Sequence, residues 1–71
     1  MKTLTKGQRI AVYQKPLTAE DREGFALLEK REIRANETGG FESWFVRFFS
    51  PMGGAEKQTV RRLVHSKHLI S

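Results

Sequence analysis

The stretch Phe41-Glu42-Ser43-Trp44-Phe45-Val46-Arg47-Phe48-Phe49 holds five of the seven aromatic residues of the chain. Bulky and β-branched side chains of this kind favour an extended backbone. Turn-forming residues bound the stretch on both sides, with Gly39-Gly40 before it and Pro51-Met52-Gly53-Gly54 after it. The pattern therefore predicts a β-strand between two turns. Because aromatic side chains bury large areas, we expect this strand to anchor the core.

Both faces of the predicted strand are apolar, whereas a strand with one wet face normally alternates apolar and polar residues. The even positions carry Trp44, Val46 and Phe48, which we assign to the core. The odd positions carry Phe41, Phe45 and Phe49, for which core and interface remain open. Either a bulge shifts the register near Phe48-Phe49, or another group covers the second face.

The length and composition describe one small domain, residues 1–71, with no cysteine to form disulfides or thiolate metal sites. A chain of this size buries only about 60% of its unfolded surface, so aromatic packing or a partner must stabilise it. No apolar run approaches the roughly 20 residues that span a bilayer. The first six residues carry positive charge, but no apolar segment follows them as it would in a signal peptide. We therefore expect a cytoplasmic protein with no membrane contact.

The net charge of +5 is unevenly distributed along the chain. Residues 1–15 and residues 57–71 each carry four lysines or arginines and no acid, whereas residues 16–56 hold all eight acids. If the fold brings the first and last strands together, these basic ends form one positive surface.

The remaining elements are predicted as short strands. Residues 6–13 form a first strand in which Ile10 and Val12 share a face, and the polar residues 14–22 form a long loop. Residues 24–35 are ambiguous, because helix propensity is high but the apolar residues form no helical stripe. We favour a strand with Phe25, Leu27 and Ile33 on one face. The alternative is a helix at about 19–35, capped by Thr18, which would give an α+β fold.

The end of the chain adds turns and two more strands. Residues 36–40 favour a hairpin turn, and residues 50–55 a second turn. Residues 56–64 then form a fourth strand, residues 65–67 a single helical turn and residues 68–70 a short closing strand. The fold class is therefore all-β, with five strands and one 3-10 turn before the last strand.

This arrangement resembles small SH3-like β-barrels of the KOW, Tudor and Agenet sort. Lys6-Gly7-Gln8-Arg9-Ile10-Ala11-Val12 is similar to their usual opening, and Glu23-Gly24-Phe25-Ala26 to their glycine-led second strand. Glu42-Ser43-Trp44-Phe45-Val46-Arg47-Phe48 followed by Thr59-Val60 is similar to their third and fourth strands. The resemblance implies a five-stranded barrel whose relatives bind RNA, DNA or peptides, or self-associate. Fold alone narrows the function little.

Two groups of residues are candidates for binding. Lysine and arginine neutralise phosphates, so a nucleic-acid site is predicted at Lys6, Arg9, Arg47, Lys57, Arg61, Arg62 and Lys67. Aromatic side chains stack on bases or pack on a partner, so a contact surface is predicted at Tyr13, Phe41, Trp44, Phe45 and Phe49. The same charges could equally serve solubility, and the same aromatics could belong to the core.

The sequence offers no catalytic constellation. The acids near residue 20 have no paired histidine or nucleophile, and the glycine pairs do not precede a Lys-Ser/Thr. His65 and His68 have a spacing that suits two metal ligands, but a zinc site needs three or four, and no third is evident. We therefore expect no catalytic residues, no metal and no cofactor.

The expected function is a basic binding module that associates with nucleic acid, DNA or RNA, and does not catalyse a reaction. The alternative is a protein-interaction or self-assembling module, in which an exposed face of Phe41, Phe45 and Phe49 recognises a protein partner or a second copy of the chain.

Overall fold

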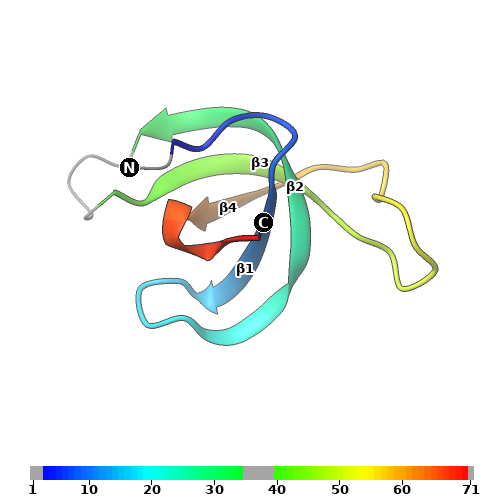
Figure 1. The fold of residues 1–71 in the computed structure, drawn as a ribbon, viewed down its shortest axis with the longest axis horizontal. Helices are drawn as coiled ribbons and strands as arrows, with labels where there is room; N and C mark the ends of the chain where they lie inside the picture. The colour runs from blue at the N-terminus through cyan, green and yellow to red at the C-terminus, as the bar shows by residue number, and fades with distance from the viewer. Residues whose placement is uncertain (1–2, 35–39, 71) are drawn as a thin grey trace.

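The computed structural model describes residues 3–34 and 40–70, which form one antiparallel sheet of five strands (Figure 1). The strands and the 3-10 turn η1, in chain order, are β1 (Arg9–Lys15), β2 (Glu20–Arg34), β3 (Glu42–Phe48), β4 (Val60–Val64), η1 (Ser66–His68) and β5 (Leu69–Ile70). Their order across the sheet is β4-β3-β2-β1-β5. The all-β prediction, with five strands and a 3-10 turn before the last, is confirmed. The strand favoured over residues 24–35 is β2, and the alternative of a helix at about 19–35 is wrong.

Strand β2 organises the sheet. Its 15 residues pair with β1 along the first part and with β3 along the second. Its register against β3 shifts between Leu28 and Lys30 and again between Arg31 and Ile33. Such irregularities bend and twist a strand. The sheet curls as a result, although in the described residues it does not close, because β4 and β5 remain its two edges (Figure 1). The register shifts of this strand pair thus lie in β2, and not near Phe48-Phe49, where a bulge was one of two alternatives.

The long loop predicted over residues 14–22 is wrong. Strand β1 continues to Lys15, which pairs with Glu20 at the start of β2, so only residues 16–19 turn the chain. The Thr18 amide donates to the Lys15 carbonyl at 3.3 Å, and the Thr18 hydroxyl donates to Glu20 at 2.8 Å. Backbone hydrogen bonds between β1 and β2 hold this part of the hairpin and require no apolar side chains. The amino-acid composition of residues 14–22 therefore does not predict that they are paired.

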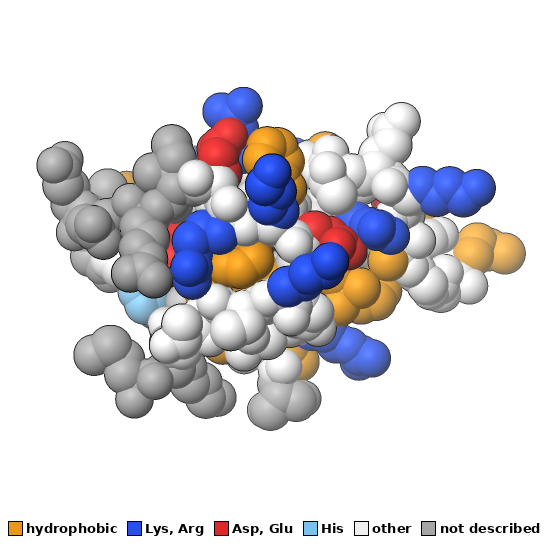
Figure 2. Space-filling view, turned by 90° about the horizontal axis from the view of Figure 1, so that it is seen from above, with side chains coloured by type: hydrophobic (Ala, Val, Ile, Leu, Met, Phe, Trp, Pro, Cys, Tyr) orange, Lys and Arg blue, Asp and Glu red, His pale blue; other side chains and the backbone are white. Residues whose placement is uncertain are grey.

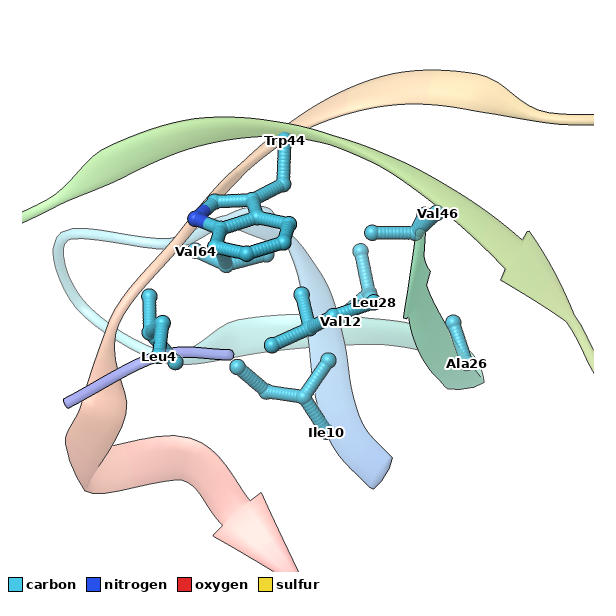
Figure 3. Packing of buried hydrophobic residues seen from close by; sticks show 8 residues of the cluster. All are labelled: Leu4, Ile10, Val12, Ala26, Leu28, Trp44, Val46 and Val64. Carbon is cyan, nitrogen blue, oxygen red and sulfur yellow. The ribbon is translucent and has the colours of Figure 1, made fainter. Parts of the chain in front are cut away.

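The core lies inside the curl of the sheet, where side chains from the first four strands converge (Figure 3). Its buried members are Leu4, Ile10, Val12, Ala26, Leu28, Trp44, Val46 and Val64. Ile10 and Val12 share the buried face of β1, as predicted, and Phe48 packs against the cluster. In β2 the face that carries Ala26 and Leu28 is buried, whereas Phe25, on the other face, is 41% exposed.

One polar network borders this core. The Trp44 indole N–H donates to Glu42 Oε1 at 2.8 Å, and the same oxygen accepts a hydrogen bond from Arg31 Nε at 2.9 Å. Arg31 also donates from Nη2 to the Leu4 carbonyl at 3.0 Å. Its guanidinium lies 5.2 Å from the centre of the Trp44 ring. The network therefore joins β2, β3 and the segment before β1 around a buried indole.

The elements after β3 have different bounds from those predicted. A bridge between Phe49 and Ala55 closes the turn after β3, and β4 begins at Val60 rather than at residue 56. The helical turn is one residue later than expected, at Ser66–His68, where the His65 ring accepts a hydrogen bond from the Lys67 amide at 3.0 Å. Strand β5 then pairs with Arg9 and Ile10 of β1. The hairpin turn predicted at 36–40 lies outside the described residues except for Gly40.

Candidate functional site

A row of three side chains crosses the middle of the sheet on its outer side. Phe45 on β3 pairs with Lys30 on β2 and with Arg61 on β4. The Arg61 guanidinium lies 6.0 Å from the centre of the Phe45 ring. A shallow groove of about 520 Å³ opens beside this row, lined by Lys6, Glu29, Lys30, Phe45 and Thr59. We call these residues, together with Glu32, Arg47 and Arg61, the Phe45 surface.

Charge on the Phe45 surface is mostly positive. Two of its arginines are oriented by glutamates of β2: Arg47 Nε lies 3.0 Å from Glu29 Oε1, and Arg61 Nε lies 3.2 Å from Glu32 Oε2. The Arg47 contact is too poorly aligned for a hydrogen bond from that nitrogen. Partly exposed pairs contribute only about 0–1 kcal/mol, so another anion can compete for these guanidiniums.

The lysines of the same surface have no such partner among the residues that the structure describes. Within the described residues, neither Lys6 nor Lys30 lies within ion-pair distance of a carboxylate. The Phe45 surface thus combines four cations with two carboxylates around one half-buried aromatic ring. In the view of Figure 2, Lys and Arg side chains likewise gather around hydrophobic ones.

The other predicted cations do not join this group. Arg62 makes two hydrogen bonds to Glu23, from Nε at 2.8 Å and from Nη2 at 2.6 Å. These bonds lower the pKa of Glu23 and raise that of Arg62. Arg9 lies against Phe49, and Lys67 against Phe41. Lys57 is exposed in the segment before β4. The predicted basic residues therefore line more than one groove: Arg61 and Arg62 line one with Tyr13, and Arg9 lines another.

The structure adds Lys30 and Thr59 to the candidate site, and sequence reasoning missed both. Lys30 was missed because it belongs to the acidic middle of the chain, where bases are outnumbered. Its place opposite Phe45 follows from the shift in register just before it. Only the register of β2 against β3, which the sequence does not show, places Lys30 in the candidate site.

Two of the predicted contact aromatics are buried. Trp44 is 3% exposed and Phe41 is 5% exposed, so neither offers a surface to a ligand. Trp44 fills the core, and Phe41 packs edge-on against His65 with ring centres 4.8 Å apart. Phe45 and Phe49 are half-buried and line different grooves. The face of Phe41, Phe45 and Phe49 expected for self-association is therefore not formed.

Tyr13 belongs to a cluster of rings around η1. Its ring centre lies 4.7 Å from that of His68, which in turn lies 6.3 Å from His65. Burial, followed by the nearby charges of Lys67 and His65, lowers the pKa of His68. In the described part of the chain no three metal-ligating side chains come together.

No protein-family model, curated protein or solved structure matches this chain. Among the described residues no helix is long and apolar enough to cross a membrane. What the protein binds must therefore be inferred from the chemistry of its surfaces.

Proposed function

We propose that this protein is a small nucleic-acid-binding module, without catalysis, that holds a single strand of DNA or RNA on the Phe45 surface. The observation that carries the proposal is the cross-strand row Lys30–Phe45–Arg61, which sets an aromatic ring between two cations. Surfaces that bind single strands combine a positive groove for the backbone with aromatic rings for the bases. The Phe45 surface has both features.

In the proposed mechanism, a base stacks on Phe45 while phosphates on either side meet the cations. Lys6 and Lys30 form no ion pair with a described residue, so they can contact a phosphate without breaking one. Arg47 and Arg61 exchange a partly exposed glutamate for a phosphate, or contact both through different nitrogens. Stacking on one ring contributes about 1–3 kcal/mol, and phosphate contacts supply affinity that depends on salt. Neither contribution reads the base sequence, so we expect weak sequence preference.

The proposed fold family is the small SH3-like barrel. The five-stranded order β4-β3-β2-β1-β5 and the 3-10 turn before the last strand support it. The curl of β2, which brings the core residues of β1, β3 and β4 together, supports it as well.

The test is fluorescence anisotropy with a labelled oligothymidylate of about 15 nucleotides, long enough for one small β-domain. Four phosphate contacts to a single strand give a slope of about −3 for log K against log salt, so affinity falls roughly 60-fold between about 50 and 200 mM salt. Phe45→Ala weakens binding at constant salt by roughly tenfold, as expected for loss of one stacked base.

Phe25→Ala is the matched control, because Phe25 is an exposed phenylalanine of the same sheet that lies outside the Phe45 surface. It is expected to leave oligonucleotide affinity within about twofold of the parent value, since it removes no stacked base. Absent or salt-independent binding would overturn the proposal, as would equal losses from the two phenylalanine substitutions.

A further inference from the structure

A second groove lies on the outer side of the sheet, where β1, β2 and β5 meet the end of β3. It has a volume of about 380 Å³ and is lined by Arg9, Phe25, Phe49 and Ile70, which we call the Phe25 groove. The Phe49 amide donates to the Phe25 carbonyl at 3.0 Å, which holds the two phenylalanines beside each other. Ile70 is the Cα partner of Arg9 across β1 and β5. The backbone ladder therefore fixes the lining.

The lining is apolar and open to solvent. Phe25 is 41% exposed and Ile70 is 39% exposed. Among the described residues, only two other large apolar side chains are exposed to this degree. The others, Leu17 and Met52, belong to turns and line no common groove with them. Apolar side chains that are exposed together, rather than singly, indicate a contact surface.

Two arginines, Arg9 and Arg22, border this apolar lining. The Arg9 guanidinium lies 5.6 Å from the centre of the Phe49 ring, and that of Arg22 lies 4.6 Å from the centre of the Phe25 ring. Within the part of the chain that the structure describes, neither lies within 4.0 Å of an acid, unlike Arg31, Arg47, Arg61 and Arg62. Both guanidiniums are held on aromatic rings and keep their charge for an incoming anion.

We propose that the Phe25 groove binds an acidic segment of a partner protein, with one apolar side chain between Phe25, Phe49 and Ile70 and a flanking Asp or Glu on Arg9 or Arg22. Charge complementarity selects this occupant, because the described lining holds the cation Arg9 and no carboxylate, and a second cation, Arg22, lies over Phe25 at the rim. The bidentate fork of arginine suits a carboxylate.

A peptide fits the groove better than a nucleic-acid strand does. The lining consists of three apolar side chains and one cation. Binding of a nucleic-acid strand instead requires several cations, placed so that they contact successive phosphates. An aliphatic or aromatic anchor of a peptide would bury Phe25 and Ile70, and its neighbouring carboxylate would reach the arginines at the rim. This site is separate from the Phe45 surface and does not depend on the function proposed for it.

The test is selection of random dodecapeptides displayed on phage against the immobilised chain of 71 residues. Enriched peptides are expected to carry an Asp or Glu within three residues of a Leu, Ile or Phe. By fluorescence anisotropy, Arg9→Gln and Phe25→Ser are each expected to weaken binding of an enriched peptide at least fivefold. Arg61→Gln is the matched control on the Phe45 surface and is expected to change peptide affinity less than twofold.

The proposal is overturned if no peptide is enriched, if the enriched peptides lack acids, or if Arg9→Gln and Phe25→Ser bind them as the parent chain does. It is overturned as well if oligothymidylate displaces an enriched peptide from the parent chain, because the two ligands would then share one surface. Circular dichroism of each variant establishes that its fold is retained. The roughly tenfold weaker oligonucleotide binding expected for Phe45→Ala, with peptide binding unchanged, separates this site from the proposed nucleic-acid function.

Discussion

Glu42→Ala is expected to destabilise the domain strongly, because one carboxylate oxygen accepts hydrogen bonds from both Trp44 and Arg31. The Trp44 indole is buried, so its N–H is left without a partner, whereas the Arg31 side chain is 30% exposed and regains water. An unpaired buried donor costs about 1–3 kcal/mol, and a hydrogen bond to a charged group contributes about 1.5–3 kcal/mol. With the exposure of Arg31 discounted, we expect a loss of about 2–3 kcal/mol in the free energy of unfolding.

This loss is a large part of the stability available to so small a domain. A chain of 71 residues has an unfolding free energy of about 4–10 kcal/mol at the usual value per residue. The corresponding fall in the melting temperature is roughly 10–20 °C. Urea titration followed by the fluorescence of Trp44, the single tryptophan of the chain, measures the effect directly.

The matched control is the same substitution in a Trp44→Phe background, followed by far-ultraviolet circular dichroism. Without the indole N–H, loss of Glu42 leaves no unpaired buried donor, so the penalty is expected to shrink by about 1 kcal/mol or more. A cost under about 0.5 kcal/mol in the parent chain, or the same cost in both backgrounds, would refute the role assigned to this network.

Two further predictions concern the turn η1 and the glycines. Burial lowers the pKa of His68 below its ordinary value of 6.5. The folded state therefore binds this proton less readily than the unfolded state does. The stability that is present above pH 6.5 is lost as the pH falls through the pKa of His68 in the folded state. Urea titrations on either side of this range should show the loss, and His68→Gln should reduce it; an undiminished loss would contradict the assignment. Gly40 and Gly53 both have φ of 91°, but an added Cβ at Gly40 would lie 3.0 Å from His65 Nε2, whereas at Gly53 it meets open space. Gly53→Ala should therefore cost about 1–2 kcal/mol and Gly40→Ala more, and equal melting temperatures would contradict this reasoning.

The core strands could be predicted from the sequence because their patterns are local. The aromatic stretch around Trp44 and the alternation of Ile10 with Val12 place these side chains inside without knowledge of the partner strands. The buried face of β2 could not be predicted in this way. Residues 25–28 are all apolar, so alternation does not distinguish the faces, and the pairing of Val12 with Gly24 decides which face is buried.

The candidate site was less predictable, because it depends on contacts between distant parts of the chain. The sequence shows basic ends and an acidic middle, but not that Glu23 would pair with Arg62, which is 39 residues away. The same applies to Glu29 with Arg47 and to Glu32 with Arg61. Strand order brings the acids of β2 to the bases of β3 and β4, and this order is a property of the whole sheet.

The most direct test of the nucleic-acid surface is a titration of the isotope-labelled chain with oligothymidylate, followed by two-dimensional NMR of the backbone amides. The largest chemical-shift changes are expected for the amides around Lys30, Phe45 and Arg61, with smaller changes near Lys6 and Thr59. The chemical shifts of the amides around Phe25 and Ile70 should not change. Chemical-shift changes confined to the amides around Phe25 and Ile70, or no changes at low salt, would contradict nucleic-acid binding on the Phe45 surface.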